Sequence, residues 1–175
     1  MTNLQTSIMS GPSTVLVIDL DGTLIRSSKQ IKGVSNDTYH SSTGPYHVYY
    51  RPGMLDWLAL KLAEHPGRVI IWSAGAESYV QHIINNILTQ LPARLEVPLA
   101  VFSRDFTGRK KNMRELRRWL RQRQVYFRQL VFVDDIPHRI YNRVRSDQIV
   151  KVSGYYPTYY KTRSHVRDYN FKDYP

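Results

Sequence analysis

The stretch Val15-Leu16-Val17-Ile18-Asp19-Leu20-Asp21-Gly22-Thr23-Leu24 decides the fold of this chain. Four consecutive apolar residues open it and predict a strand buried on both faces, as the strands of parallel sheets are. Asp19 and Asp21 follow with one residue between them, and Gly22 permits a sharp turn directly afterwards. Because open α/β sheets build their sites at the carboxyl ends of strands, we expect both carboxylates to project to one point there. The alternative is an Asp-Gly turn that only closes a core strand.

The pattern of strand, turn and helix recurs along the chain. Apolar runs predict further strands over 68–72, 99–102, 130–133 and, at an edge, 149–152. Apolar residues at helical spacing predict amphipathic helices over 54–63, 79–88 and 111–124. Strands that alternate with helices predict an α/β fold, a Rossmann-like parallel sheet with helices on both faces.

The length favours one domain, because 175 residues bury enough surface for a single core. We expect a flexible lead-in over 1–13, a folded domain over 14–154, and a basic, Tyr-rich tail over 155–175 to which no structure is assigned. Within the domain, the polar residues 26–47 predict a mobile loop or a small hairpin insertion that could overhang the site.

Composition excludes several classes of protein. The chain contains no cysteine, so disulfides, thiolate metal sites and cysteine nucleophiles are excluded. No apolar run approaches the roughly 20 residues of a membrane span, and the first thirteen residues do not resemble a secretory signal. We therefore expect a soluble intracellular protein without a membrane partner, in the nucleus or the cytoplasm.

The formal net charge of +11 favours phosphate-rich or acidic partners. Basic residues concentrate between Arg104 and Arg128, and a helix over 109–123 would carry most of them. The ordinary role of such a run is a solvated helix face, and the alternative is contact with a phosphate-rich partner such as nucleic acid. The sequence does not determine the oligomeric state.

A second acidic pair, Asp134-Asp135, ends the strand predicted over 130–133. Alone it could be a turn or capping pair. If its strand neighbours the one that ends at Asp19, four carboxylates meet at one edge and repel one another. The sequence therefore predicts a bound hard divalent cation with oxygen ligands, for which Mg²⁺ is the natural choice. The histidines that show no spacing typical of metal ligands are His40, His47 and His138.

Six short motifs occur in order along the chain. They are Asp19-Leu20-Asp21-Gly22-Thr23-Leu24; Tyr50-Arg51-Pro52-Gly53 with Leu55 and Trp57-Leu58; Ile71-Trp72-Ser73-Ala74-Gly75 with Tyr79; Ser103-Arg104-Asp105; Lys111-Asn112-Met113; and Val133-Asp134-Asp135. This set resembles the motifs of haloacid-dehalogenase-type (HAD) phosphatases, and in particular of the NLI-interacting-factor-like family that acts on the carboxyl-terminal domain of RNA polymerase II. The resemblance covers roughly residues 14–140.

The resemblance implies an HAD-type fold, capless or with a small insertion after the first strand, and Mg²⁺-dependent phosphatase activity. Asp19 would attack phosphorus to form an aspartyl-phosphate, and Asp21 would protonate the leaving oxygen and then activate water. Ser73 would hydrogen-bond the phosphoryl oxygens. Lys111 would supply positive charge, with the adjacent Lys110 as the alternative.

The resemblance also implies a metal site and a substrate-binding set. Mg²⁺ would be held by the side chains of Asp19 and Asp134 and by the backbone carbonyl of Asp21. Asp135 would contact the ion through a water molecule or would contact these ligands instead. The expected substrate-binding residues are Thr23, Ala74, Gly75 and Arg104. For Arg104 the alternative is a salt bridge to Asp105.

The phosphatases that act on the carboxyl-terminal domain of RNA polymerase II, here called polymerase-tail phosphatases, usually carry Glu at the position of Gly22. The chain departs from them at this residue. The segment between Asp21 and Trp72 is also short for a large helical cap. An open site goes with macromolecular substrates in this superfamily, so the leading hypothesis is a phosphatase for phosphoserine or phosphothreonine on a protein such as a polymerase-tail-like peptide. The alternatives are a phosphatase of nucleic-acid ends and a catalytically idle scaffold that binds a partner.

Overall fold

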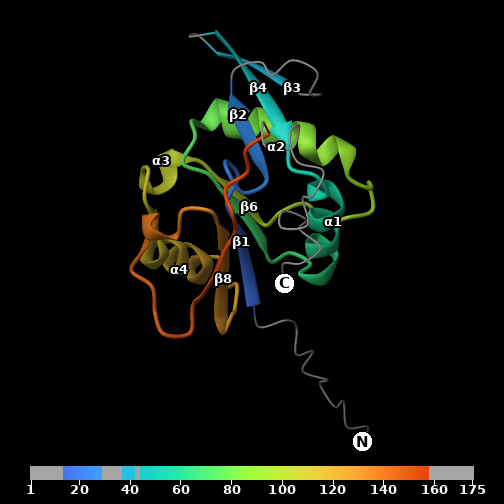
Figure 1. The fold of residues 1–175 in the computed structure, drawn as a ribbon. Helices are drawn as coiled ribbons and strands as arrows, with labels where there is room; N and C mark the ends of the chain where they lie inside the picture. The colour runs from blue at the N-terminus through green and yellow to red at the C-terminus, as the bar shows by residue number, and fades with distance from the viewer. Residues whose placement is uncertain (1–13, 29–36, 42–43, 158–175) are drawn as a thin grey trace, which may run out of the picture.

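A five-stranded parallel sheet forms the centre of the protein, which is described here by a computed structural model over residues 14–28, 37–41 and 44–157 (Figure 1). The strand order is β10-β8-β1-β5-β6, and every neighbouring pair is parallel. The strands are β1 (Thr14–Ile18), β5 (Val69–Trp72), β6 (Ala100–Phe102), β8 (Gln129–Asp134) and β10 (Gln148–Lys151). The predicted α/β fold is confirmed, and the lead-in predicted over 1–13 lies outside the described residues.

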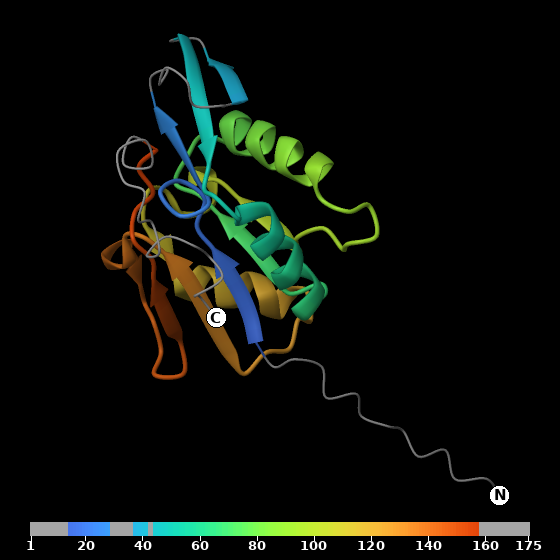
Figure 2. The ribbon, with the colours of Figure 1, turned by 45° about the vertical axis from the view of Figure 1, so that its right-hand side comes forward.

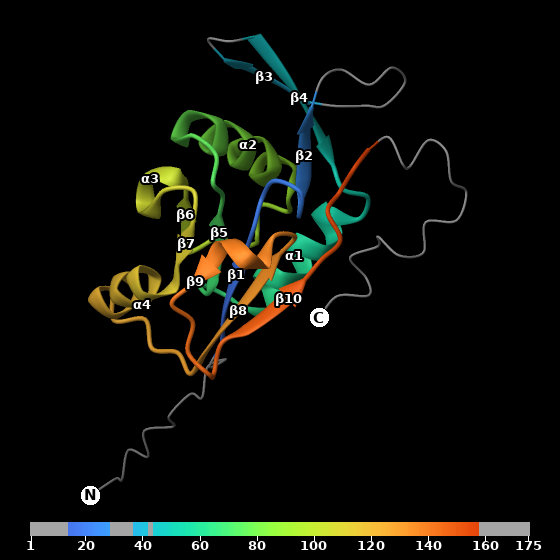
Figure 3. The ribbon, with the colours of Figure 1, turned by 60° about the vertical axis from the view of Figure 1, so that its left-hand side comes forward.

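Strand β1 shows why the sheet is covered on both faces. Leu16 and Ile18 belong to the apolar cluster that contains α1 (Met54–Glu64) and α2 (Glu77–Gln90). Val15 and Val17 belong to the opposite cluster, which contains the apolar residues of α4 (Met113–Gln122). Figures 2 and 3 show α1 and α2 on one side of the sheet and α4 on the other. No helix of the described part of the chain is long and apolar enough to cross a membrane.

The segment after β1 forms a small antiparallel sheet, which confirms the hairpin alternative of the sequence analysis. Its strands are β2 (Ile25–Ser28), β3 (Asp37–Ser41) and β4 (Gly44–Tyr50), in the order β2-β4-β3. Figure 1 shows this insertion projecting beyond the carboxyl ends of the central strands, and β3 contacts α2. Residues 29–36 and 42–43 of the predicted insertion lie outside the described residues.

The basic segment after β6 is less regular than predicted. A short helix α3 (Arg104–Thr107) comes first, and α4 begins only at Met113. Between them, β7 (Lys111–Asn112) pairs with β9 (Ile140–Tyr141), which follows the 3₁₀ turn η1 (Pro137–Arg139). Helices predicted to begin at residue 109 or 111 were therefore wrong at their start. The reason is that Asn112 caps α4, since its side-chain oxygen accepts the Arg114 N–H at 3.1 Å.

The chain after β10 returns across the loop that follows β1. The Val152 N–H donates to the Asp134 carbonyl at 3.1 Å, and the Tyr155 N–H donates to the Gly22 carbonyl at 2.8 Å. The Tyr155 side chain is only 3% exposed. The first residues of the predicted tail therefore pack against the domain, and the domain boundary at residue 154 stays a prediction. Residues 158–175 lie outside the described part.

Candidate active site

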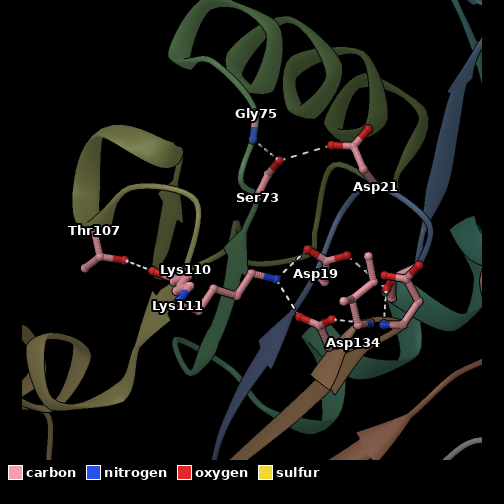
Figure 4. A network of polar contacts seen from close by, with 11 residues as sticks. Asp19, Asp21, Ser73, Gly75, Thr107, Lys110, Lys111 and Asp134 are labelled. Atoms are coloured by element: carbon pink, nitrogen blue, oxygen red, sulfur yellow. Dashed lines mark hydrogen bonds and ion pairs between the residues drawn. The ribbon is translucent and has the colours of Figure 1, made fainter. Parts of the chain in front are cut away.

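Asp19 and Asp134 lie side by side because they end neighbouring parallel strands. The Asp19 N–H donates to the Val133 carbonyl at 2.9 Å, which continues the pairing of β1 with β8 as far as the acids. The ammonium of Lys111 sits between the two carboxylates, paired with Asp19 and 2.6 Å from Asp134 Oδ2 (Figure 4). All three side chains are buried, with exposed fractions of 6%, 2% and 4% for Asp19, Asp134 and Lys111.

The carboxylates carry more charge than one ammonium balances. Burial raises the pKa of Asp19 to about 7, with Lys111 opposing the shift and the charge of Asp134 adding to it. Burial also raises the pKa of Asp135, and Asp134 adds to this shift. For Lys111, burial lowers the pKa, but Asp19 and Asp134 outweigh it, so the net shift is upward and the ammonium stays protonated. Three carboxylates against one ammonium leave an excess of negative charge that a divalent cation would balance.

The donor set fits a hard divalent cation. Asp19, Asp134 and Asp135 each offer an oxygen, and these oxygens lie within 4.8 Å of one another. Ligands that share a Mg²⁺ at about 2.1 Å lie up to roughly 4 Å apart, so small side-chain movements bring the three together. Asp21 is not in this group, since its carboxylate turns toward α2. A contribution from Asp21 would thus come from its backbone carbonyl, as the resemblance implies.

Thr23 links Asp19 to Asp135 from a buried position outside the cavity lining. Its hydroxyl donates to Asp19 Oδ2 at 3.1 Å and accepts the Asp135 N–H at 3.2 Å. The Ile136 N–H donates to Asp134 Oδ1 at 2.7 Å. Thr23 is fully buried and does not line the cavity described below, so the structure places this predicted substrate-binding residue where it orients the carboxylates.

Asp21 is held by hydroxyl groups. Ser73 Oγ donates to Asp21 Oδ2 at 3.1 Å, and the Tyr79 hydroxyl donates to Asp21 Oδ1 at 2.6 Å. Ser27 of β2 contacts the Tyr79 hydroxyl and lies 3.4 Å from Asp21 Oδ1. Asp19 and Asp21 face the same cavity, yet one is held by an ammonium and the other by neutral donors. Two acids in such different surroundings suit two different chemical roles.

Tyr79 is the residue whose role the sequence analysis missed. It was assigned to the apolar face of a helix and to a motif, and neither assignment shows that its hydroxyl reaches Asp21. Burial, together with the negative charge of Asp21, raises the pKa of Tyr79, so the hydroxyl remains a proton donor. Gly75 makes room for the ring, because a Cβ at this position would lie 2.8 Å from Tyr79 Cδ1.

Gly22 and Arg51 fix the loop that joins Asp19 and Asp21 to β2. Gly22 has a φ of +84°, and a Cβ there would lie 2.2 Å from Asp135 Oδ2. The carboxylate of Asp135 therefore occupies the space that a side chain at position 22 would need. The buried Arg51 guanidinium donates to the carbonyls of Gly22 at 2.8 Å and Ser153 at 2.6 Å, so it joins the loop to the returning chain.

A cavity of about 670 Å³ opens above these groups. Of the predicted substrate-binding residues, Ala74, Gly75 and Arg104 line it. Ser73 is fully buried beneath the lining, and its hydroxyl accepts the Gly75 N–H at 2.9 Å. Of the two candidate lysines, Lys111 reaches the carboxylates, whereas Lys110 is exposed at the surface.

The geometry agrees with the comparisons to known proteins. Two solved structures share the fold: Fcp1, an essential RNA polymerase II CTD phosphatase (TM-score 0.58, 20% identity), and fission yeast RNA polymerase II CTD phosphatase Fcp1-R271A bound to beryllium fluoride (TM-score 0.54, 16% identity). Each match covers 81% of this chain, but only 42% and 41% of the respective Fcp1 chains. A search of curated proteins finds no match.

The sequence profile of one family, described as NLI interacting factor-like phosphatase, matches residues 14–166. The matched range contains every acid, hydroxyl and lysine of the site. The resemblance noted in the sequence is thereby confirmed, and this chain belongs to the NLI interacting factor-like family of HAD-type phosphatases.

Proposed function

We propose that the protein is a Mg²⁺-dependent phosphomonoesterase that acts through an aspartyl-phosphate on phosphoserine or phosphothreonine of a protein. The observation that carries this proposal is the Lys111 ammonium bound between Asp19 and Asp134 at the base of the cavity. A carboxylate nucleophile approaches an anionic phosphate only where positive charge shields the two from each other. Lys111 provides part of that charge and fixes the orientation of Asp19.

In the first step, an oxygen of Asp19 attacks phosphorus while the bond from phosphorus to the leaving oxygen breaks. Asp21 gives a proton to that oxygen, so serine or threonine leaves as the alcohol. In the second step, Asp21 takes a proton from water as the water oxygen attacks phosphorus. Inorganic phosphate leaves and Asp19 is regenerated. Mg²⁺ bound by Asp19, Asp134 and Asp135 would supply further positive charge to the phosphoryl oxygens.

The substrate class rests on the cavity and on the relatives. The described part of the insertion is the small three-stranded sheet β2-β4-β3, with no helical cap, which suits a chain-like substrate. Both solved structures are named as phosphatases of the RNA polymerase II CTD. We therefore propose a substrate among phosphorylated protein segments similar to this polymerase domain.

The test measures phosphate release from p-nitrophenyl phosphate and from phosphoserine peptides, with Mg²⁺ and with a chelator. We expect turnover that requires the metal and that Asp19→Asn reduces by at least about a thousandfold, because the nucleophile is lost. Asp56→Asn, at an exposed acid in the first turn of α1, is the matched control and should leave turnover unchanged. Full activity of Asp19→Asn, or no release from any substrate with Mg²⁺, contradicts the proposal; the second result favours an idle scaffold.

A further inference from the structure

Three arginines line the cavity without a role in the chemistry proposed above. They are Arg104, Arg109 and Arg139, all of them exposed at its rim. Within the described part of the chain, no acidic side chain forms an ion pair with any of them, including Asp105 beside Arg104. Arginines that point into one cavity and remain unpaired repel each other, so their arrangement indicates an anionic ligand.

The two-stranded sheet β7-β9 places two of these arginines. Lys111 pairs in register with Ile140, and both of these side chains are buried. The residue that precedes Ile140 is Arg139, the exposed last residue of the 3₁₀ turn η1. Arg109 precedes Lys111 by two residues in the same connection. The two segments that lead into β7 and β9 therefore each bring one guanidinium group to the rim, next to the strand that carries Lys111.

Arg104 joins them from α3, whose first N–H donates to the Gly75 carbonyl at 3.0 Å. The other side of the cavity carries no arginine among its described lining residues but the hydroxyl groups of Ser27 and Tyr79, which surround the Asp21 carboxylate. The positive charge of the rim is thus one-sided. In the proposed function, Lys111 and the metal ion stabilise the charge of the phosphoryl group under attack. The arginines at the rim are therefore available to bind a different anion.

We propose that these arginines bind a second phosphate on the same peptide, so that the enzyme prefers multiply phosphorylated segments; this inference rests on the proposed function. The Cα atoms of residues 109 and 111 lie at most about 7 Å apart, which corresponds to about two residues of extended peptide. Because Lys111 and these arginines line one cavity, we expect the second phosphate within a few residues of the one that is hydrolysed. A single nucleic-acid strand would instead be held along a basic groove with aromatic side chains for base stacking, whereas these arginines gather at one cavity.

The test compares four substrates at equal concentration. They are p-nitrophenyl phosphate, a peptide with one phosphoserine, the same peptide with a second phosphoserine two residues away, and a version with the second phosphoserine ten residues away. We expect the wild-type kcat/KM to be about tenfold higher for the closely spaced pair than for the other two peptides. Arg109→Gln combined with Arg139→Gln should abolish this preference and change the hydrolysis of p-nitrophenyl phosphate less than about twofold.

Arg94→Gln is the matched control. Arg94 is exposed in the connection after α2, whose 14 residues carry the chain about 20 Å from the site. It should retain the full preference for the closely spaced pair. Equal kcat/KM for all peptides, or a preference that survives in the double variant, overturns the inference. A 5′-phosphorylated oligonucleotide that is hydrolysed faster than the doubly phosphorylated peptide also overturns it, in favour of nucleic-acid ends.

A binding measurement separates failure of this inference from failure of the proposed function. Fluorescence anisotropy with the Asp19→Asn protein reports peptide affinity without turnover. If the wild type hydrolyses none of the substrates but Asp19→Asn binds the closely spaced pair about tenfold more tightly than the single phosphopeptide, the arginine subsite stands and the enzymatic proposal fails. If hydrolysis occurs with equal affinities, the subsite fails alone.

Discussion

At the scale of single residues, the contact between Gly22 and Asp135 connects a departure in sequence with the acidic group that we propose as the metal site. The polymerase-tail phosphatases that the chain resembles usually carry Glu at the position of Gly22. Here a side chain would collide with the Asp135 carboxylate, and the backbone has a left-handed φ of +84°. The glycine thus allows Asp135 to approach the loop closely enough to join Asp19 and Asp134.

Gly22→Ala should therefore weaken Mg²⁺ binding by about tenfold or more, because the new methyl group displaces Asp135. The measurement is the concentration of Mg²⁺ at half-maximal phosphatase activity, supported by the Mg²⁺-induced rise in melting temperature. Gly67→Ala is the matched control, since Gly67 also has a left-handed φ of +61° but its Cβ would meet nothing closer than 3.5 Å. Both variants should lose roughly 1–2 kcal/mol of stability from backbone strain. Unchanged Mg²⁺ dependence in Gly22→Ala would show that Asp135 plays no part.

At the scale of elements, α2 and β2 meet at the acid Asp21. Tyr79 lies in the first turns of α2, and its hydroxyl contacts both Asp21 and Ser27 of β2. The insertion thereby takes part in holding the acid that we propose as the proton donor.

Tyr79→Phe should lower kcat for a phosphoserine peptide by about tenfold, because Asp21 loses a donor that fixes its position. The same variant should leave kcat for p-nitrophenyl phosphate nearly unchanged, since nitrophenolate is a weak base and leaves without a proton. Tyr126→Phe, at a side chain that is 83% exposed, serves as the control. An equal loss on both substrates would instead indicate that Tyr79 shapes the cavity as a whole.

The elements also show which parts of the site the sequence can predict. β1, β5 and β8 were predictable because each is a run of buried apolar residues, and the acids that end β1 and β8 follow from them. The position of Lys111 depends on a two-residue strand, which is too short to leave a periodic pattern. Its pairing with β9 depends on contacts between segments far apart in the chain, as does the contact of Tyr79 with Asp21. Propensities of neighbouring residues carry no information about either.

At the scale of the whole molecule, the returning chain and Arg51 close the structure over the loop after β1. The Gly22 carbonyl accepts from both Arg51 and the Tyr155 N–H. The Arg51 guanidinium carbon lies 5.6 Å from the centre of the Tyr155 ring. Burial raises the pKa of Tyr155 to about 12, with Arg51 opposing the shift, so the ring hydroxyl is neutral at physiological pH.

Tyr155→Ala should destabilise the protein by about 3 kcal/mol, because it leaves a cavity beside the buried Arg51. For a chain of this size, that corresponds to a melting temperature lower by roughly 6–12 °C. Tyr126→Ala should change the melting temperature by less than about 2 °C, because the Tyr126 side chain is 83% exposed. A loss in Tyr155→Ala no greater than in this control would mean that the returning chain does not stabilise the loop.

The position of β1 has a consequence for how the protein is made. β1 is the first of the five strands to leave the ribosome, yet it lies between β5 and β8, and its loop is completed by Arg51 and Tyr155. A nascent chain that stops short of residue 155 already contains both acids and the lysine but lacks one of the two donors to Gly22. Translation must therefore run as far as residue 155 before this loop has both of its donors, so we expect the proposed activity only after that segment has been made.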